Sequence, residues 1–389
     1  MPAESIEPSG PPAGWYRSPS LLGAVDDNPT RTLIAEGIER LARDAHLAPP
    51  VRDGRLDRVG DDLARMNPQA HLPSFELVAF LLGHYGVAEP EPQMRYGIVD
   101  PRAPRNFVEL IAPQVTALLR TMPRPRLGVG LALLGDELAV VLALQSQNLE
   151  LRPVPRALSL GLVVHLEGRL FPGYHVPKVI VTFENGTVDD VRVRGTGAGF
   201  EAALGCRPDR RGALQVEIAA DSDRGPAVLA NFPVYCGVDP PARSPAVALD
   251  TSGAQDPEAV EKRLLELVNR DRGHQGLGLV RLDSRLSEIA RAHSREMADT
   301  GVVGHVSPRT GNVRDRVLHA RIDVALLGEN VGQDYSAAGA HRGFMSSPGH
   351  RSNVVDPRMT AVGIGVVRGK EHTEPVPLYI TEIFAAGLQ

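Results

Sequence analysis

Three short motifs dominate the C-terminal third of this chain: G-H-V-S-P (Gly304–Pro308), G-E-N (Gly328–Asn330) and S-S-P-G-H-R-S-N (Ser346–Asn353). Most of their other residues are Gly, Pro and Ser, which fix backbone shape more than they fill a core. Two histidines and one glutamate also lie in these motifs, so we expect the functional site here. These candidate catalytic side chains are His305, Glu329 and His350.

Length and composition set the broad class. A chain of 389 residues exceeds one ordinary hydrophobic core, so we expect several domains. Its 42% hydrophobic and 23% charged residues are typical of globular domains. It has no apolar run of about 18 residues that could span a bilayer. With a formal net charge of −5, the chain lacks the excess of positive charge that binds nucleic-acid phosphates, so nucleic acid is not an expected partner.

The two cysteines, Cys206 and Cys236, match neither a CxxC pattern nor zinc-knuckle spacing. Both flank strand-like segments of one region, which favours a single disulfide if the protein is exported. Two buried free thiols are the alternative for a cytosolic protein. The N-terminus has no basic start and no apolar segment of a signal peptide. We expect residues 1–25 to be a flexible leader, within which Trp15 and Tyr16 could be pinned to the first domain.

The first domain is expected over residues 26–150. Capping chemistry around Asn28 precedes apolar residues at helical spacing, which predicts a helix of about 15 residues. Amphipathic stretches predict a second helix near Asp53 and a third over 107–119. Two apolar runs within 126–144, separated by a polar turn, predict a β-hairpin.

The C-terminal segment repeats this plan. Asp283–Ile289 can be laid over Asp53–Val59, and Val362–Gly365 over Leu127–Gly130, again ahead of strands. The spacing of about 230 residues is much longer than solenoid repeats use and predicts an internal duplication. The first copy has none of the three motifs, so we expect a structural or partner-binding domain there.

Residues 155–240 contain several short β-rich runs separated by turns, which predicts an all-β sandwich domain. Asn185-Gly186 lies between two of the runs and is a strong hairpin signal. Proline, serine and alanine then predict a linker over 241–254. The last domain is expected over 255–389.

With its three motifs quoted, the segment 255–389 resembles a CAP domain, the family of cysteine-rich secretory, antigen 5 and plant pathogenesis-related 1 proteins, in its cysteine-poor bacterial branch. The resemblance implies an α-β-α sandwich, an extracellular or envelope location, and a cleft lined by histidine and acidic residues. His305 and Glu329 match the first His and the Glu of the family site. His350 belongs to the bacterial form, and Tyr379 stands where the plant and animal branch has its second His.

The candidate site supports several interpretations. Two imidazoles and a carboxylate suit zinc, so His305, His350 and Glu329 are possible metal ligands that could activate water. We rate a hydrogen-bonded network above catalysis, with His350 locking a Pro348-Gly349 turn and Glu329 accepting from neighbouring backbone amides. A serine hydrolase using Ser307 beside His305 is the weakest option. Arg309, Arg314 and Arg316 near the cleft could attract an anionic ligand, but an arginine-rich surface is the default expectation for them.

The overall prediction is a multidomain α+β protein in which two CAP-like α-β-α sandwich domains flank an all-β sandwich. We expect a secreted or envelope protein whose cleft binds a small ligand, of the lipid or envelope class that the resemblance suggests. A hydrolase, metal-dependent or metal-free, and a purely structural interaction protein are the alternatives. The expected binding residues are His305, Ser307, Glu329, Asn330, His350 and Asn353.

Overall fold

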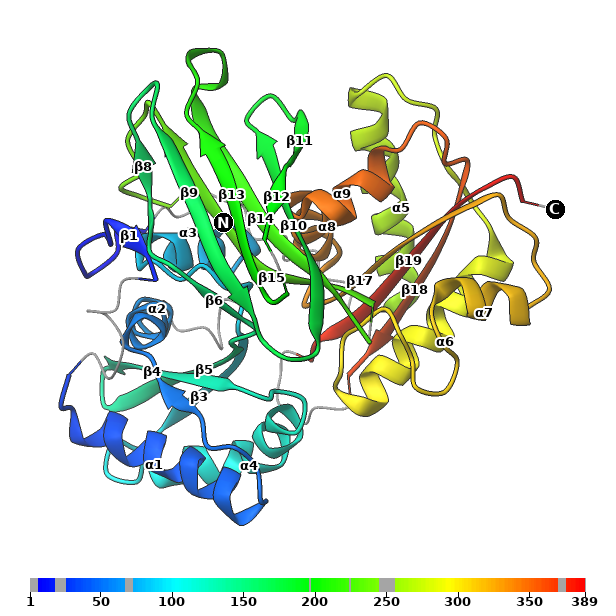
Figure 1. The fold of residues 1–389 in the computed structure, drawn as a ribbon. Helices are drawn as coiled ribbons and strands as arrows, with labels where there is room; N and C mark the ends of the chain where they lie inside the picture. Colours follow the sequence, from blue (N-terminus) through cyan, green and yellow to red (C-terminus); the bar gives the residue numbers. More distant parts are fainter. Residues whose placement is uncertain are drawn as a thin grey trace. The chain divides into compact units, whose positions relative to one another are not determined.

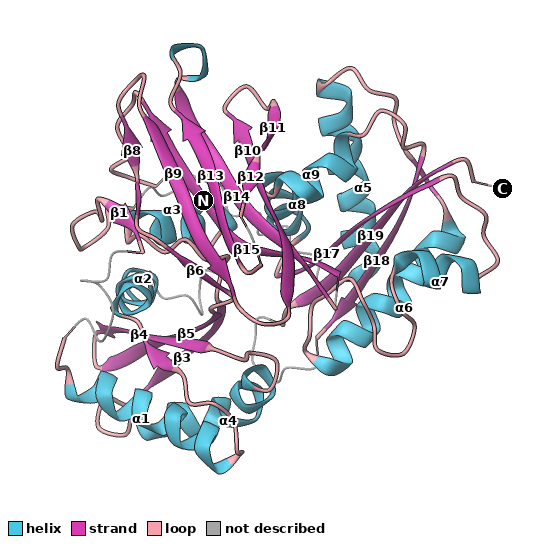
Figure 2. Ribbon diagram, in the orientation of Figure 1, coloured by secondary structure: helices cyan, strands magenta, loops and turns pink. Residues whose placement is uncertain are grey.

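The computed structural model describes residues 6–17, 26–66, 73–195, 197–223, 225–244, 256–369 and 376–388. These fall into two compact units, Met1–Ala220 with Val228–Ala248, and Asp221–Ala227 with Leu249–Gln389. Helices and strands occur in both, so the predicted mixed α+β class is confirmed (Figures 1 and 2). Within the described residues, no helix is long and apolar enough to cross a membrane.

The first unit contains a four-stranded sheet of order β2-β4-β5-β3, in which only the β2–β4 pair is parallel. Helices α1 and α4 pack on one face and α2 and α3 on the other. Alternate residues of β5 enter the two cores, with Val140 on one face and Val141 on the other. The elements are α1 (Pro29–Asp44), β2 (Val51–Arg52), α2 (Gly54–Arg65), α3 (Phe75–His84), β3 (Gln93–Val99), α4 (Arg105–Leu119), β4 (Pro125–Leu134) and β5 (Glu137–Ser146).

The second unit contains a four-stranded sheet of order β16-β18-β19-β17, again with one parallel pair, β16–β18. Helices α5, α8 and α9 cover one face, and α6 and α7 cover the other. The elements are α5 (Pro257–His274), β16 (Arg281–Leu282), α6 (Ser284–Thr300), α7 (Val313–His319), β17 (Leu326–Asp334), α8 (Ala337–Ser346), α9 (Pro348–Val355), β18 (Ala361–Arg368) and β19 (Leu378–Ala386).

The two four-stranded sheets share local contacts as well as strand order. The N–H of Asp53 donates to Leu127 O, and the N–H of Asp283 donates to Val362 O. Both aspartates also cap the helix that follows them. These are the positions that the sequence alignment pairs. The internal duplication itself stays a prediction.

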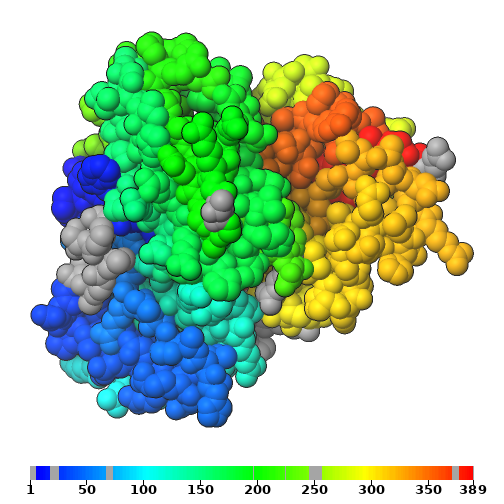
Figure 3. Space-filling model, in the orientation of Figure 1, coloured from blue at the N-terminus to red at the C-terminus, as the bar shows by residue number. Residues whose placement is uncertain are grey.

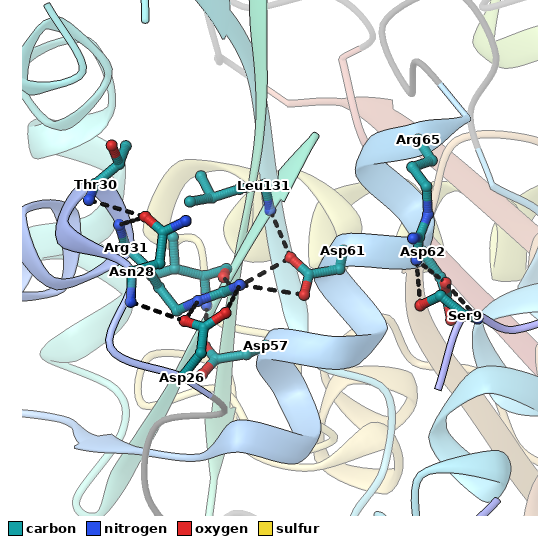
Figure 4. Close-up of polar contacts among 11 residues, drawn as sticks. Ser9, Asp26, Asn28, Thr30, Arg31, Asp57, Asp61, Asp62, Arg65 and Leu131 are labelled. Atoms are coloured by element: carbon teal, nitrogen blue, oxygen red, sulfur yellow. Dashed lines mark hydrogen bonds and ion pairs between the residues drawn. The ribbon is translucent and has the colours of Figure 1, made fainter. Parts of the chain in front are cut away.

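An ion pair joins α1 to α2 beside the first sheet, and another joins α5 to α6 beside the second, with the charges exchanged between the two helices. Arg31 of α1 pairs with Asp61 of α2, whose Oδ1 accepts from the N–H of Leu131 at 2.8 Å (Figure 4). In the second unit, Glu261 of α5 pairs with Arg291 of α6 and accepts from the N–H of Val366 at 3.0 Å. The carboxylate therefore lies on the second helix in one set and on the first helix in the other.

The first unit also carries a β-rich region, with sheets of order β11-β10-β14-β15-β8 and β12-β13-β9-β6. A disulfide between Cys206 and Cys236 links the end of β13 to β15, with Cα atoms 5.2 Å apart. The predicted Asn185-Gly186 turn is confirmed, since β10 and β11 pair around it. The remaining elements are β6 (Leu149–Leu151), β7 (Val154–Pro155), β8 (Ala157–Leu158), β9 (Val163–Leu170), β10 (Tyr174–Phe183), β11 (Val188–Val191), β12 (Val193–Arg194), β13 (Gly199–Gly205), a 3-10 turn (Pro208–Arg210), β14 (Gly212–Ser222) and β15 (Gly225–Cys236).

Part of the expected leader is held in place. Strand β1 (Trp15–Tyr16) pairs with β7, and the buried Tyr16 hydroxyl donates to Pro233 O at 2.6 Å. Figure 3 shows deep-blue residues at the surface beside green ones. Residues 1–5 and 18–25 of the leader, and 245–254 of the predicted linker, lie outside the described residues.

Candidate functional site

The centre of the candidate site is a hydrogen bond between His305 and Glu329. Glu329 projects from β17, and its Oε2 lies 3.0 Å from His305 Nδ1. Because a carboxylate accepts, Nδ1 carries the hydrogen, which leaves Nε2 as the second ring nitrogen. The Glu329 side chain is 3% exposed, whereas that of His305 is 19% exposed. The pair therefore joins a buried anion to an imidazole that reaches solvent.

Arg316, on α7, holds the other oxygen of Glu329. Its Nη2 forms an ion pair with Glu329 Oε1, and its Nη1 donates to Gly311 O at 2.7 Å and to His305 O at 3.2 Å. Arg316 is buried, so its expected place on an arginine-rich surface is wrong. The expectation that Glu329 accepts from backbone amides is also wrong, because His305 and Arg316 occupy its two oxygens. The local sequence around Arg316 does not show that its side chain is buried in an ion pair with Glu329.

His350 lies in the first turn of α9. Its ring centroid is 6.0 Å from that of His305 and 5.3 Å from that of Phe344, against which it packs edge to face. Burial, and then the neighbouring His305, lower the pKa of His350 to about 3, so the imidazole is neutral near pH 7. The predicted Pro348-Gly349 turn is instead the start of a helix, with proline at a first-turn position that needs no N–H donor.

Ser307 belongs to a neighbouring but separate cluster. Its hydroxyl lies 2.7 Å from both carboxylate oxygens of Glu296 on α6, and it accepts from the N–H of Arg309 at 3.0 Å and of Thr310 at 2.9 Å. The hydroxyl therefore donates to Glu296 and is committed to closing this turn. Ser307 and His305 do not form the nucleophile and base pair of a serine hydrolase.

Asn353 and Asn330 connect helix α9 to the sheet. Asn353 Nδ2 donates to Glu329 O at 3.1 Å and to Asn330 Oδ1 at 2.9 Å. Asn330 Nδ2 in turn donates to Glu382 Oε2 at 3.0 Å. Burial raises the pKa of Glu382 to about 7, against the opposing effect of the Asn330 hydrogen bond. Glu382 is not among the site residues predicted from the sequence, where its signal is a carboxylate within the mostly apolar strand β19.

The placed donors do not fit the predicted three-ligand zinc site. Both oxygens of Glu329 are engaged, and His305 Nδ1 is used by Glu329. Across the ranges that the structure describes, no three or more His, Cys, Asp or Glu side chains are grouped so that they could hold a metal ion. We therefore derive no chemical step through a metal.

The corresponding positions of the first sheet carry different side chains. In the β3–β5 pair, Met94 lies opposite Ala143. In the β17–β19 pair, Glu329 lies opposite Ile383 at the corresponding position. By the same register, Leu142 occupies the position of Glu382. Two carboxylates of the second sheet are thus matched by apolar residues in the first, and for Glu329 this follows from the missing G-E-N motif.

Comparison with solved structures finds low similarity. An extracellular SCP-domain protein from Bacillus anthracis is 18% identical with a TM-score of 0.30, covering 57% of this chain and 78% of that chain. A cysteine-rich secretory protein from Staphylococcus aureus is 13% identical with a TM-score of 0.28, covering 62% and 81%. These values are too low to support an argument.

Sequence comparison is more specific. YkwD, an uncharacterized protein of Bacillus subtilis, is 34% identical over 128 residues, which are 33% of this chain and 50% of YkwD. YlbC, an uncharacterized membrane protein of the same species, is 33% identical over 109 residues, 28% of this chain and 32% of YlbC. The chain thus spans half or less of these relatives. The model of the cysteine-rich secretory protein family, CAP, matches residues 265–384. Residues 265–384 of this chain are therefore a CAP domain.

Proposed function

We propose that this chain is a secreted or cell-envelope protein whose CAP domain binds a small ligand at His305, Glu329 and His350. The observation that carries the proposal is the buried Arg316–Glu329 pair, which fixes Nδ1 of a partly exposed His305. A histidine held through one ring nitrogen presents the other in a set orientation. The remaining expected binding residues lie around it, Asn330 and Asn353 in the same network and Ser307 in the adjoining turn.

The disulfide between Cys206 and Cys236 supports the export part of the proposal. Disulfides persist in oxidising compartments and are rare in the cytosol. One of the similar proteins, YlbC, is described as a membrane protein, which agrees with an envelope location. Fractionation of the native producer, followed by thiol labelling, tests this. Cytosolic protein with two reactive thiols would contradict it.

The ligand class we propose is a lipid or another cell-envelope component. Fluorescent palmitate and phosphatidylglycerol vesicles are suitable probes, with binding read by fluorescence anisotropy and vesicle flotation. We expect His305→Ala to weaken binding about tenfold or more. The matched control is His319→Ala, since His319 is exposed at the end of α7. Equal binding by wild type and both variants would place the ligand elsewhere, and binding of neither probe would reject this class.

A hydrolase is the second candidate, because a His305 oriented by Glu329 has the arrangement of a general base and its positioning carboxylate. Ser307 is committed to Glu296, so the nucleophile would be water. Hydrolysis of p-nitrophenyl acetate and of phospholipid, compared between wild type and His305→Asn, distinguishes the two functions. A rate that falls at least tenfold in the variant, with binding retained, favours the enzyme.

For the rest of the chain we propose the division 26–150, 155–240 and 255–389, with the first segment a degenerate CAP-like copy that serves structure or partner binding. The shared strand order and the paired contacts of Asp53 and Asp283 support the duplication. A structural interaction protein remains the third candidate function for the whole chain. Limited proteolysis should cut within 241–254 first, and a first cut inside 155–240 would contradict this division.

A further inference from the structure

Three ring nitrogens of His305 and His350 have no hydrogen-bond partner among the described residues. Glu329 occupies Nδ1 of His305, so Nε2 is left. His350 contacts His305 and Phe344 through its ring, and both of its nitrogens are left. Nδ1 of His293 also lacks a partner, but that atom is fully buried, whereas none of these three is. They are therefore groups of the site that remain accessible to a ligand.

The hydrogens that these nitrogens carry decide what they can bind. His305 donates from Nδ1 to Glu329, so in the neutral ring Nε2 has no hydrogen and only accepts. Burial lowers the pKa of His350 and keeps it neutral near pH 7, so one of its nitrogens donates and the other accepts. A ligand atom shared by the two rings must therefore donate to His305 and can accept from His350. A hydroxyl does both, whereas an ionised carboxylate or phosphate oxygen only accepts.

The distance between the two rings suits one shared oxygen. Their centroids are 6.0 Å apart, and the ring planes are tilted by 45°. A hydrogen bond of about 2.9 Å from the edge of each ring reaches an oxygen lying between them. Glu329 holds His305 in place, and the edge-to-face contact with Phe344 holds His350. One hydroxyl can thus lie within hydrogen-bond distance of both rings.

The charges beside the two rings do not select an anion. The carboxylate of Glu329 is paired with Arg316, and both side chains are buried. Arg351 has no ion-pair partner among the described residues. It follows His350 on α9, however, and consecutive residues of a helix do not face each other. An anionic head group would have to use Arg351, and it would leave Nε2 of the neutral His305 unpaired.

We propose that the head group bound at this site is a hydroxyl of a sugar or a glycerol, and not an ionised carboxylate or phosphate. The hydroxyl donates its hydrogen to His305 Nε2, and its oxygen accepts from the N–H of His350. The inference rests on the ligand-binding function proposed above and specifies the chemistry of the ligand. Envelope glycans and glycerol lipids both supply such hydroxyls.

The test measures the binding of four eight-carbon probes to the full chain by isothermal titration calorimetry, each below its aggregation concentration. Monooctanoylglycerol and octyl glucoside carry hydroxyls, octanoate carries the anion, and methyl octanoate lacks both. Titrations at pH 8 keep imidazoles of ordinary pKa neutral. We expect each hydroxylated probe to bind about tenfold more tightly than octanoate or methyl octanoate. The tighter of the two assigns the hydroxyl to a glycerol lipid or to a sugar.

Protein variants locate the hydroxyl. His350→Phe keeps the contact with Phe344 and removes the N–H, so we expect monooctanoylglycerol to bind about tenfold more weakly and methyl octanoate to be unaffected. His305→Phe should remove the same preference by loss of Nε2. Arg351→Gln should leave the preference unchanged. His319→Ala is the matched control, because His319 is exposed at the end of α7. Thermal melting identifies any variant that fails to fold.

The outcomes separate the head group from the function of the site. Octanoate binding as tightly as the hydroxylated probes, and lost in His305→Ala, would overturn the hydroxyl while leaving ligand binding at the site intact. A hydroxyl preference that survives in folded His305→Phe and His350→Phe would overturn both, because the ligand would then lie elsewhere. No heat from any of the four probes would also overturn the hydroxyl, and the palmitate and phosphatidylglycerol assays would then decide the function separately.

Discussion

Asn330 and Glu382 face each other across strands β17 and β19, with Asn330 Nδ2 3.0 Å from Glu382 Oε2 and neither side chain exposed. The other oxygen, Glu382 Oε1, is buried and has no partner among the described residues. A carboxylate that is half satisfied in a dry environment is most stable when protonated. This accounts for the raised pKa of Glu382.

The first prediction concerns Glu382→Gln. The folded-state pKa of about 7 lies above the ordinary value of 4.5, so the folded protein binds the extra proton between these values. Glu382 therefore contributes stability that is present below pH 4.5 and lost as pH rises through 7. At pH 8 the neutral glutamine should be more stable than the wild type by roughly 1 to 3 kcal/mol, and the difference should vanish near pH 4.

Urea unfolding from pH 4 to 8 measures this effect. Glu288→Gln is the control, because Glu288 is exposed on α6. If both variants follow the wild-type pH dependence, Glu382 is not protonated in the folded state.

The second prediction concerns the ion pair of Arg316 and Glu329. Glu329→Gln leaves the buried guanidinium without its anion, which should cost about 3 to 5 kcal/mol. Glu329→Gln combined with Arg316→Met should cost less than the sum of the single changes, because no charge is then left unpaired. Denaturant unfolding of the four proteins gives the coupling energy. Additive costs would show that the pair is not formed.

The third prediction concerns His350. Its folded-state pKa of about 3 lies below the ordinary 6.5, so the unfolded chain binds a proton first as pH falls. Stability is then complete above pH 6.5 and declines between 6.5 and 3. His350→Phe, which keeps the contact with Phe344, should lose less stability over this window. Histidine proton resonances followed by NMR provide the direct measurement, and a midpoint for His350 near 6.5 would refute the prediction.

The fourth prediction concerns zinc. Because Glu329 is fully engaged, zinc should leave the melting temperature unchanged relative to chelator. A working site would stabilise the protein by about 2.7 kcal/mol at a hundredfold excess over the dissociation constant. Zinc-dependent stabilisation that disappears in both His305→Ala and His350→Ala would restore the metal site predicted from the sequence.

The fifth prediction concerns the disulfide. Cys206 and Cys236 are 30 residues apart, so replacing both with alanine should cost about 3 to 4 kcal/mol by loss of the chain constraint. Unfolding with and without reductant checks this in the wild type. A double-alanine variant as stable as the oxidised protein would show that the crosslink contributes nothing to stability.

Local signals in the sequence located the elements well where the chemistry is local. Asn28, Asp53 and Asp283 each cap a helix at the expected place, and the apolar runs around residue 135 form the β4–β5 hairpin. The same approach missed helix α3 and treated the start of α9 as a turn, because Gly349 and the polar residues beside it resemble a loop.

The candidate site shows which functional residues sequence motifs can identify and which they cannot. The residues His305, Glu329 and His350 could be selected by motif, and the structure brings all three close together. Their partners could not, since Arg316 and Glu382 gain their roles from burial and from contacts 13 and 52 residues away along the chain. The hydrophobic periodicity of a sequence does not predict which charged side chains will be buried.

The exchanged charges of the two interhelical ion pairs bear on how the chain assembles. Two similar units on one chain allow the wrong helix to dock during folding. If α1 docked beside α6, Arg31 would meet Arg291, and if α5 docked beside α2, Glu261 would meet Asp61. Each mistaken pairing would place two like charges side by side, whereas each correct pairing joins opposite charges. The polarity of each salt bridge thus distinguishes the helix that belongs to a sheet from its counterpart elsewhere on the chain.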